Sequence, residues 1–358
     1  MRALTRYGAS RAELASLLDD EPRYRVDQVW DALWRRRVAL ESATELPGAL
    51  RTRLADLLPL ALAPVTELVS ADELTRKWLW AAGDAQVETV LMRSPRRASV
   101  CVSSQAGCAM GCTFCATGQA GFDRHLRADE IVEQVLRAEH ASPQRVTNVV
   151  YMGMGEPLAN YDEVWASVVT LKEALGLSAR RLTISTVGVV PGMRRLATEG
   201  LPVTLAVSLH APDDALRATL VPLNHRYPIA EVLDAAADVA GASGRRVTFE
   251  YAGIAGVNDQ PAHAEALARL LGSWPGVGGS HVNLIPLNAT AGFPGRASAL
   301  PALHDFARRL RARGVTATVR RTRGADIDAA CGQLRRRTLI PPERSGSTRM
   351  GPCASTGS

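Results

Sequence analysis

Three cysteines stand close together in Cys108-Ala-Met-Gly-Cys112-Thr-Phe-Cys115, a C-x3-C-x2-C spacing. Cysteine thiolates hold iron–sulfur clusters, and a 4Fe-4S cluster normally takes four of them. Three thiolates from one short loop would leave one iron without a protein ligand. An open iron can bind a small molecule, and for this spacing we expect the amino and carboxylate groups of S-adenosylmethionine (SAM). The loop predicts a radical SAM enzyme with its cluster on Cys108, Cys112 and Cys115.

A zinc site is the main alternative for these cysteines. Structural zinc takes four protein ligands in a closed tetrahedral site. The only candidate nearby for a fourth ligand is His125, ten residues after Cys115. The spacing therefore favours the cluster.

Composition narrows the class of protein. The chain has 358 residues, 46% of them hydrophobic, enough for one large α/β domain with a small appendage. No apolar run is long enough for a membrane helix, and we see no signal peptide, so we expect a cytoplasmic protein without a membrane partner. In such a chain, six cysteines indicate metal binding or catalysis more than structural disulfides.

The charge balance is basic, with a net charge of +6 and only Lys77 and Lys172 as lysines among 42 basic residues. Guanidinium groups bind phosphate in a bidentate manner, so an arginine-rich surface suits a nucleic acid. A GC-rich genome that encodes arginine in place of lysine explains the composition equally well.

Hydrophobic periodicity divides the chain into four parts: an N-terminal helical region (1–60), a strand hairpin connector (61–95), a partial barrel (96–335) and a disordered basic tail (336–358) that contains Cys353. Within the barrel, strands alternate with helices, which indicates a parallel sheet. We therefore predict an α/β fold, a partial (β/α)6-type barrel. The predicted strands are 98–103, 147–152, 182–186, 203–208, 247–251, 282–286 and 315–319. The predicted helices are 128–140, 162–175, 191–199, 229–240, 261–272 and 300–313.

The other unusual residues all follow predicted strands, where barrels place their active sites. They are Gly155-Glu156 after 147–152, Ser185 in 182–186, Ser208-Leu209-His210 after 203–208, Asn288 after 282–286 and Cys331 after 315–319. Each has a simpler explanation alone, such as a turn, a cap or a strand end. Gly153-Met-Gly155 could be part of a dinucleotide loop, but the third glycine is missing and Pro157 intervenes.

Five motifs together resemble the RlmN-type RNA methyltransferases, from about residue 20 to 335. These motifs are Cys101-Val-Ser-Ser-Gln105 leading into the cysteine loop, Met152-Gly-Met-Gly-Glu-Pro-Leu158, Leu182-Thr-Ile-Ser-Thr186, Ser208-Leu-His210 and Asp326-Ile-Asp-Ala-Ala-Cys-Gly-Gln-Leu334. The resemblance implies methylation of carbon 2 of an adenosine in the peptidyl-transferase region of 23S rRNA. In many members of the family it also implies methylation of the adenosine beside the anticodon of some tRNAs.

The resemblance also implies roles for single residues. Cys331 would be methylated, Glu88 would be the proton acceptor and Cys101 the second redox thiol. The residues implied to hold SAM are Gly155, Glu156, Ser185, Ser208, Leu209, His210 and Asn288. Two SAM molecules would be used per turnover, and flavodoxin or ferredoxin would be the electron donor. The enzyme would be a monomer.

The chemistry explains why such parts would be needed. Carbon 2 of adenine is electron-poor and not a nucleophile, so ordinary methyl transfer from SAM fails and a cofactor-derived radical is required. A methyl radical carried on Cys331 would join enzyme and RNA covalently, and a thiol and a base would release them. The Cfr-type enzymes, which act on carbon 8, share most motifs, but Pro157 and Pro286-Leu287 fit the RlmN type better. Another radical SAM reaction with a structural Cys331 and a non-enzymatic iron–sulfur RNA-binding protein are the remaining alternatives.

RNA must also be bound and opened to expose the base. Arginines of the N-terminal helices and the pair Trp30 and Trp34 are candidates for that task. Helix packing is the simpler role for the two tryptophans.

Overall fold

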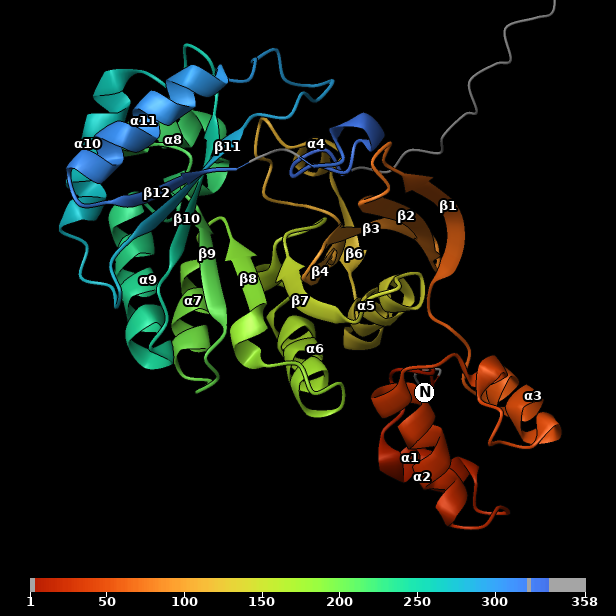
Figure 1. Cartoon of the computed structure of the whole chain (residues 1–358). Coiled ribbons are helices and arrows are strands. Elements are labelled where there is room, and N and C mark those ends of the chain that lie inside the picture. Colours follow the sequence, from red (N-terminus) through yellow and green to blue (C-terminus); the bar gives the residue numbers. More distant parts are fainter. Residues whose placement is uncertain (1–3, 321–322, 335–358) are drawn as a thin grey trace, which may run out of the picture.

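The computed structural model describes residues 4–320 and 323–334 (Figure 1). The predicted tail at 336–358, with Cys353, lies outside these residues. In the part described, no helix is both long and apolar enough to cross a membrane.

The N-terminal region is helical, as predicted. It comprises α1 (Arg11–Leu17), α2 (Tyr24–Trp30), a π-helical turn (Asp31–Arg36), a 3-10 turn (Leu40–Ser42) and α3 (Gly48–Leu57). A capping box starts α1, in which Ser10 and Glu13 each bind the other's backbone N–H. The Trp34 ring is buried and lies 5.6 Å from the Trp30 ring, centroid to centroid. Trp34 therefore packs in the core of this region, the simpler of the two roles considered for it.

One ten-stranded sheet forms the rest of the fold, in the order β1-β2-β3-β4-β7-β8-β9-β10-β11-β12. The strands from β4 to β12 pair in parallel, whereas β1 to β4 pair antiparallel. The predicted partial barrel is confirmed, because β1 and β12 end the sheet and do not pair with each other. The bounds are β1 (Ala63–Val69), β2 (Thr75–Ala82), β3 (Ala85–Ser94), β4 (Arg97–Cys101), β7 (Val146–Tyr151), β8 (Leu182–Thr186), β9 (Thr204–Ser208), β10 (Thr248–Gly253), β11 (His281–Pro286) and β12 (Thr316–Val319).

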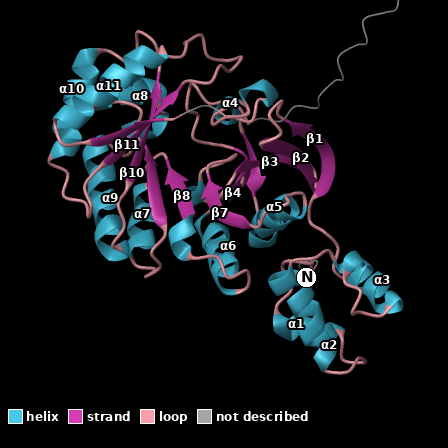
Figure 2. Cartoon of the chain, in the orientation of Figure 1, coloured by secondary structure: helices cyan, strands magenta, loops and turns pink. Residues whose placement is uncertain are grey.

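The six predicted barrel helices are all present and cover the outer face of the sheet (Figure 2). Their bounds are α5 (Ala128–His140), α6 (Tyr161–Glu173), α7 (Val190–Ala197), α9 (Ile229–Ser243), α10 (Pro261–Gly272) and α11 (Leu300–Ala312). Each buries an apolar stripe, as helices that pack on a sheet must. In α5, for example, Ile131, Val132, Val135 and Leu136 are all buried.

Several short elements were not predicted from the sequence. They are β1, a separate two-stranded sheet of β5 (Gln105–Gly107) and β6 (Phe122–His125), α4 (Ala116–Gln119), α8 (Asp214–Leu220) and 3-10 turns at Pro157–Ala159, Ala179–Arg181, Pro222–His225 and Ala325–Ile327. The β5–β6 pair brackets the cysteine loop and α4, so the loop starts and ends on one small sheet.

The segment after β12 crosses the open side of the sheet and docks on the β2–β3 hairpin. The Arg323 guanidinium donates to the Arg93 carbonyl (3.2 Å), and the Asp326 carboxylate accepts from the backbone N–H of Ala71 (2.9 Å). The segment then passes α4, where the backbone N–H of Ala116 donates to the Gly332 carbonyl (2.8 Å). The hairpin is thus part of the same sheet and supports the chain that carries Cys331.

Candidate functional site

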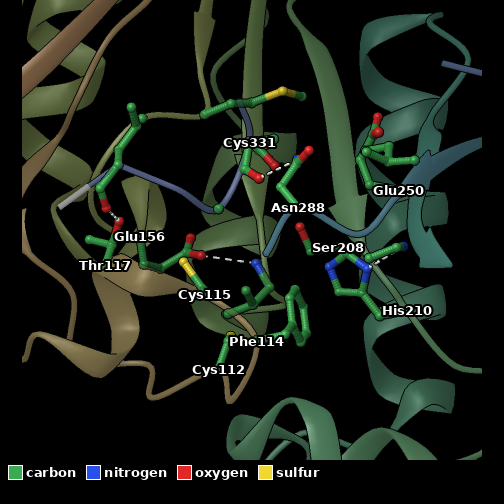
Figure 3. Close-up of a pocket in the computed structure, with 18 of the residues that line it drawn as sticks. Cys112, Phe114, Cys115, Thr117, Glu156, Ser208, His210, Glu250, Asn288 and Cys331 are labelled. Atoms are coloured by element: carbon green, nitrogen blue, oxygen red, sulfur yellow. Dashed lines mark hydrogen bonds between the residues drawn. The ribbon is translucent and has the colours of Figure 1, made fainter. Parts of the chain in front are cut away.

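A pocket opens at the carboxyl ends of the parallel strands, where the sequence predicted the site. It contains about 950 Å³ of empty space, counting the solvent at its mouth. Figure 3 shows side chains that converge there from the cysteine loop, from the carboxyl ends of β7, β8, β9, β10 and β11 and from the segment after β12. The predicted residues that line it are Cys112, Cys115, Gly155, Glu156, Ser185, Ser208, His210, Asn288 and Cys331. Cys108, Leu209, Cys101 and Glu88 are not part of this lining.

The cysteine loop turns tightly over α4. The backbone N–H of Cys115 donates to the Cys112 carbonyl (3.1 Å), and that of Cys108 donates to the Gly121 carbonyl (2.7 Å). Burial raises the pKa of the Cys108 thiol to about 12, and the nearby Glu156 and Cys115 contribute to this rise. Burial raises the pKa of Cys112 in the same way. Thiolates crowded together and removed from water need positive charge, which bound iron would supply.

The ligand geometry separates a cluster from a single ion. Among the described residues, no three His, Cys, Asp or Glu side chains converge as a ligand set for one ion. Zinc would require sulfur atoms about 2.3 Å from a single point. The loop supplies three cysteines, one fewer than a closed zinc site needs and the number that leaves one iron of a 4Fe-4S cluster open.

Glu156 is a buried carboxylate held by backbone donors. One oxygen accepts from the Leu158 N–H (3.0 Å) and the other from the Val187 N–H (2.9 Å). Burial raises the pKa of Glu156 to about 7, against the lowering effect of these hydrogen bonds. Within the described ranges it forms no ion pair, so the carboxylate is suited to receive an ammonium group from a ligand.

Gln105 fixes the backbone that presents Glu156. Its side-chain carbonyl accepts from the backbone N–H of Glu156 (2.8 Å). Gly155 lies directly beside it with φ of 101°, and a Cβ there would come within 2.5 Å of the Gln105 Cβ. Only glycine allows this close approach.

Arg217 joins the ends of two neighbouring strands, and the sequence did not single it out. Its guanidinium is fully buried and donates to the carbonyls of Val187 (2.6 Å), Ser208 (3.1 Å) and Leu209 (3.1 Å), and to the Asn224 side chain (2.9 Å). Burial lowers the pKa of Arg217 to about 10, so it stays charged at neutral pH. Leu209 lies in the core, so its place in the site is set through its backbone.

His210 is held as a neutral imidazole. Burial, with a further contribution from Arg217, lowers its pKa to about 3. Its Nδ1 accepts from the Ala252 N–H (3.0 Å), so the proton is on Nε2. The residue has φ of 60°, and the Asn258 side chain donates to its carbonyl (2.8 Å). His210 therefore offers the pocket a neutral hydrogen-bond donor in a fixed orientation.

Cys331 lies at the pocket mouth in a loop held from both sides. The Asn288 side chain donates to the Cys331 carbonyl (2.9 Å), and the Thr117 hydroxyl donates to the Leu334 carbonyl (2.6 Å). The residue is exposed, yet the protein around its thiol excludes enough water to raise the pKa to about 12, and the nearby Glu250 and Cys115 contribute to this rise. The Cys331 thiol is therefore neutral until a base or a ligand changes its surroundings.

Cys101 and Glu88 lie behind this loop on adjacent strands. Cys101 pairs in register with Val90, two residues from Glu88 on β3, so all three face the same side of the sheet. On that side, Val90 and Cys101 pack against Ala329 and Leu334 of the Cys331 segment. Burial raises the pKa of Cys101, and the nearby Cys331 thiol raises it further. The described cysteines form no disulfide with one another.

A loop of three cysteines beside a pocket at the carboxyl ends of parallel strands is typical of radical SAM enzymes. Comparison of this chain with known proteins agrees with that class. Residues 102–268 match the family described as the Radical SAM superfamily. A crystal structure of a radical SAM methyltransferase from Sphaerobacter thermophilus superposes with a TM-score of 0.86 and 48% identity, covering 93% of this chain and 99% of that one. The chain is a radical SAM methyltransferase.

Curated relatives define the family more narrowly. A protein of Frankia casuarinae named "Probable dual-specificity RNA methyltransferase RlmN" is 53% identical over 94% of this chain and 85% of its own length. One of the same name from Salinispora tropica is 54% identical over 88% of this chain and 87% of its own. The chain belongs to the RlmN family of RNA methyltransferases.

Replacing Cys112 with Ala should remove iron from the purified protein and abolish reductive SAM cleavage, because two thiolates do not hold the cluster. Iron analysis and the visible absorption spectrum measure this. Iron at the wild-type level would contradict the assignment, and Cys353→Ala serves as the matched cysteine control.

Replacing Glu156 with Ala should weaken SAM binding by about tenfold or more while iron content is kept, because a charged hydrogen bond contributes about 1.5–3 kcal/mol. Equilibrium binding of SAM to the iron-loaded protein measures it. Glu156→Gln, which keeps the shape but not the charge, should be nearly as impaired. Unchanged affinity in both variants would remove Glu156 from the SAM site.

Replacing Arg217 with Met should lower the free energy of unfolding by about 3 kcal/mol, because three buried carbonyls lose a charged donor. Thermal or denaturant unfolding measures this loss. Arg226→Met, outside this network, is the control and should change stability by less than about 0.5 kcal/mol. A loss in Arg217→Met no larger than in the control would contradict the bridging role.

Proposed function

We propose that this enzyme methylates carbon 2 of adenosine in RNA, with 23S rRNA and tRNA as the two substrates. The relatives are named dual-specificity RNA methyltransferases, which supports two classes of RNA. The observation that carries the proposal is the position of the segment with Cys331: Cys331 lines the pocket, while Ala329 and Leu334 of the same segment pack against Cys101 and Val90, on the sheet face that Glu88 shares. This arrangement suits a methyl group that is carried on the protein.

Cys108, Cys112 and Cys115 would hold a 4Fe-4S cluster, and Glu156 would receive the amino group of SAM. When bound, this pair supplies a radical able to remove hydrogen from a methyl group. Ser185, Ser208 and Asn288 add polar side chains to the same wall, and His210 adds its Nε2 donor. Two SAM molecules are used in each turnover, because Cys331 must also receive its methyl group from one.

Cys331 has to reach both the pocket and the RNA base. The hydrogen bond from the Asn288 side chain holds the Cys331 carbonyl. Gly332, with φ of 84°, follows Cys331, so Cys331 lies at a turn. Once the methyl carbon is joined to adenine, Cys331 and the RNA share a thioether. The adduct gives up one electron, for which the cluster would be the acceptor, and Glu88 takes the proton of carbon 2. The Cys101 sulfur then attacks the Cys331 sulfur, the bond from that sulfur to the methylene carbon breaks, and the methylene carbon takes up the proton that the Cys101 thiol loses. The methylated RNA leaves, and a Cys101–Cys331 disulfide remains until thiols reduce it.

RNA recognition is assigned to the N-terminal helical region at 1–60, where arginines stand on an exposed surface. Arg35 and Arg11, for example, have exposed side chains. Contacts of this kind give an affinity that falls as salt rises. A flavodoxin or ferredoxin is the proposed electron donor, and the enzyme acts as a monomer in the cytoplasm.

The carrier role of Cys331 has a direct test on a denaturing gel with labelled RNA. Cys101→Ala should methylate Cys331, join it to RNA and then stall, which gives a band of lower mobility. Cys331→Ala should bind SAM but never form this band, and the double variant should lack it as well. Normal turnover by Cys101→Ala would assign release to another group, and RNA methylation by Cys331→Ala would disprove the carrier role. Mass spectrometry of the digested product distinguishes carbon 2 from carbon 8.

A further inference from the structure

Lys77 is a buried lysine in a chain whose basic residues are almost all arginines. Of 42 basic residues only two are lysines, so arginine occupies nearly every cationic position. The other lysine, Lys172, has a side chain that is 39% exposed at the end of α6. The side chain of Lys77 is 9% exposed, in the middle of β2. A composition that favours arginine so strongly makes a buried lysine a position where the shape of the cation matters.

The Lys77 ammonium contacts two groups that belong to different parts of the site. It forms an ion pair with the Glu88 carboxylate on β3 (3.0 Å). It also donates to the backbone carbonyl of Asp328 (3.1 Å), three residues before Cys331. Glu88, like Lys77, is buried. One cation thus joins the hairpin carboxylate to the segment that carries the methylated cysteine.

Strand register explains how this contact arises. Lys77 pairs with Val90 and Leu79 pairs with Glu88, so Lys77 and Glu88 are diagonal neighbours on one face. Val90 in turn pairs with Cys101 on β4. The proton acceptor, the second thiol and Lys77 therefore share the face on which Ala329 and Leu334 pack.

Arginine would not reproduce these contacts. A guanidinium is planar and broad, whereas an ammonium is compact and points three N–H donors in different directions. A buried carboxylate and a carbonyl from a crossing segment suit the ammonium. The opposite face of the hairpin shows an arginine in a different role: there the guanidinium carbon of Arg137, from α5, lies over the Trp80 ring, 4.7 Å from the ring centre.

We infer that Lys77 is a positioning residue that holds Glu88 and the Cys331 segment in one arrangement for the release of methylated RNA. This inference rests on the proposed function. Lys77 touches neither RNA nor SAM in this role. It acts by keeping the base at a fixed place relative to the thioether that Cys331 forms, so its loss should slow release and spare the earlier steps.

The experiment uses the full-length, iron-loaded enzyme with Lys77→Met. This variant should still methylate Cys331 and join RNA. Release should slow by at least about tenfold, because a small displacement of a reacting group is enough for that. The covalent complex should therefore accumulate on a denaturing gel. Lys172→Met is the matched control and should release RNA at the wild-type rate.

A second readout does not depend on turnover. Amide hydrogen exchange of residues 325–334, in the enzyme without RNA and SAM, should be faster in Lys77→Met than in Lys172→Met, since the bond to Asp328 is lost. Asp326→Ala removes another contact that holds the segment, the one with the Ala71 N–H, without touching Glu88. This variant should also speed amide exchange at 325–334. It should slow the release of RNA less than Lys77→Met does.

Coupling to Glu88 is tested with Glu88→Gln and the double variant. If Lys77 acts through Glu88, Lys77→Met should slow release no further once Glu88 is Gln. Lys77→Met alone leaves the buried Glu88 charge without its ion-pair partner, which could impair folding. The double variant removes both buried charges together and so avoids this problem. Additive effects on release would overturn the inference, as would unchanged exchange at 325–334.

The inference and the proposed function fail in different ways. If Cys101→Ala and Glu88→Gln trap RNA but Lys77→Met does not, only the role of Lys77 is wrong. If Cys101→Ala never traps RNA, the carrier mechanism is wrong, and with it the role of Lys77 in release.

Discussion

The unclosed sheet is the constraint on which the site depends. Because β12 does not pair with β1, the chain must cross the gap, and the backbone and side-chain groups along that path must find partners elsewhere. They find them in the turn between β1 and β2, at Ala71, on β2, at Lys77, and at the start of α4, at Ala116 and Thr117. The same contacts that complete the fold bring Cys331 to the mouth of the pocket.

Buried polar groups give the pocket wall its shape. Arg217 and Asn258 touch backbone carbonyls and amides at the ends of neighbouring strands, where regular sheet hydrogen bonding stops. Such ends carry unpaired backbone groups that are costly to bury. Side chains that satisfy them also fix the direction in which Ser208 and His210 leave the sheet. The ligand wall is thus built by groups that contact no ligand.

Sequence reasoning predicted the parts whose signals are local. The parallel strands of the barrel and the six longer helices that cover them were found, because apolar runs and helical periodicity lie within short windows. The cysteine loop was found for the same reason. Strand β1 was missed because most of its residues are exposed and it lacks an apolar face. Arg217 was missed because its importance depends on carbonyls from two strands, which only the folded chain brings together. The contact of Lys77 with Asp328 spans 251 residues, and no sequence pattern indicates it.

The placement of the two thiols outside the cysteine loop has a consequence for the resting enzyme. Both Cys101 and Cys331 have a raised pKa, so each remains protonated at neutral pH. Oxidants and electrophiles attack thiolates far faster than thiols. A chain that keeps this pair neutral is protected against accidental oxidation and alkylation between catalytic cycles.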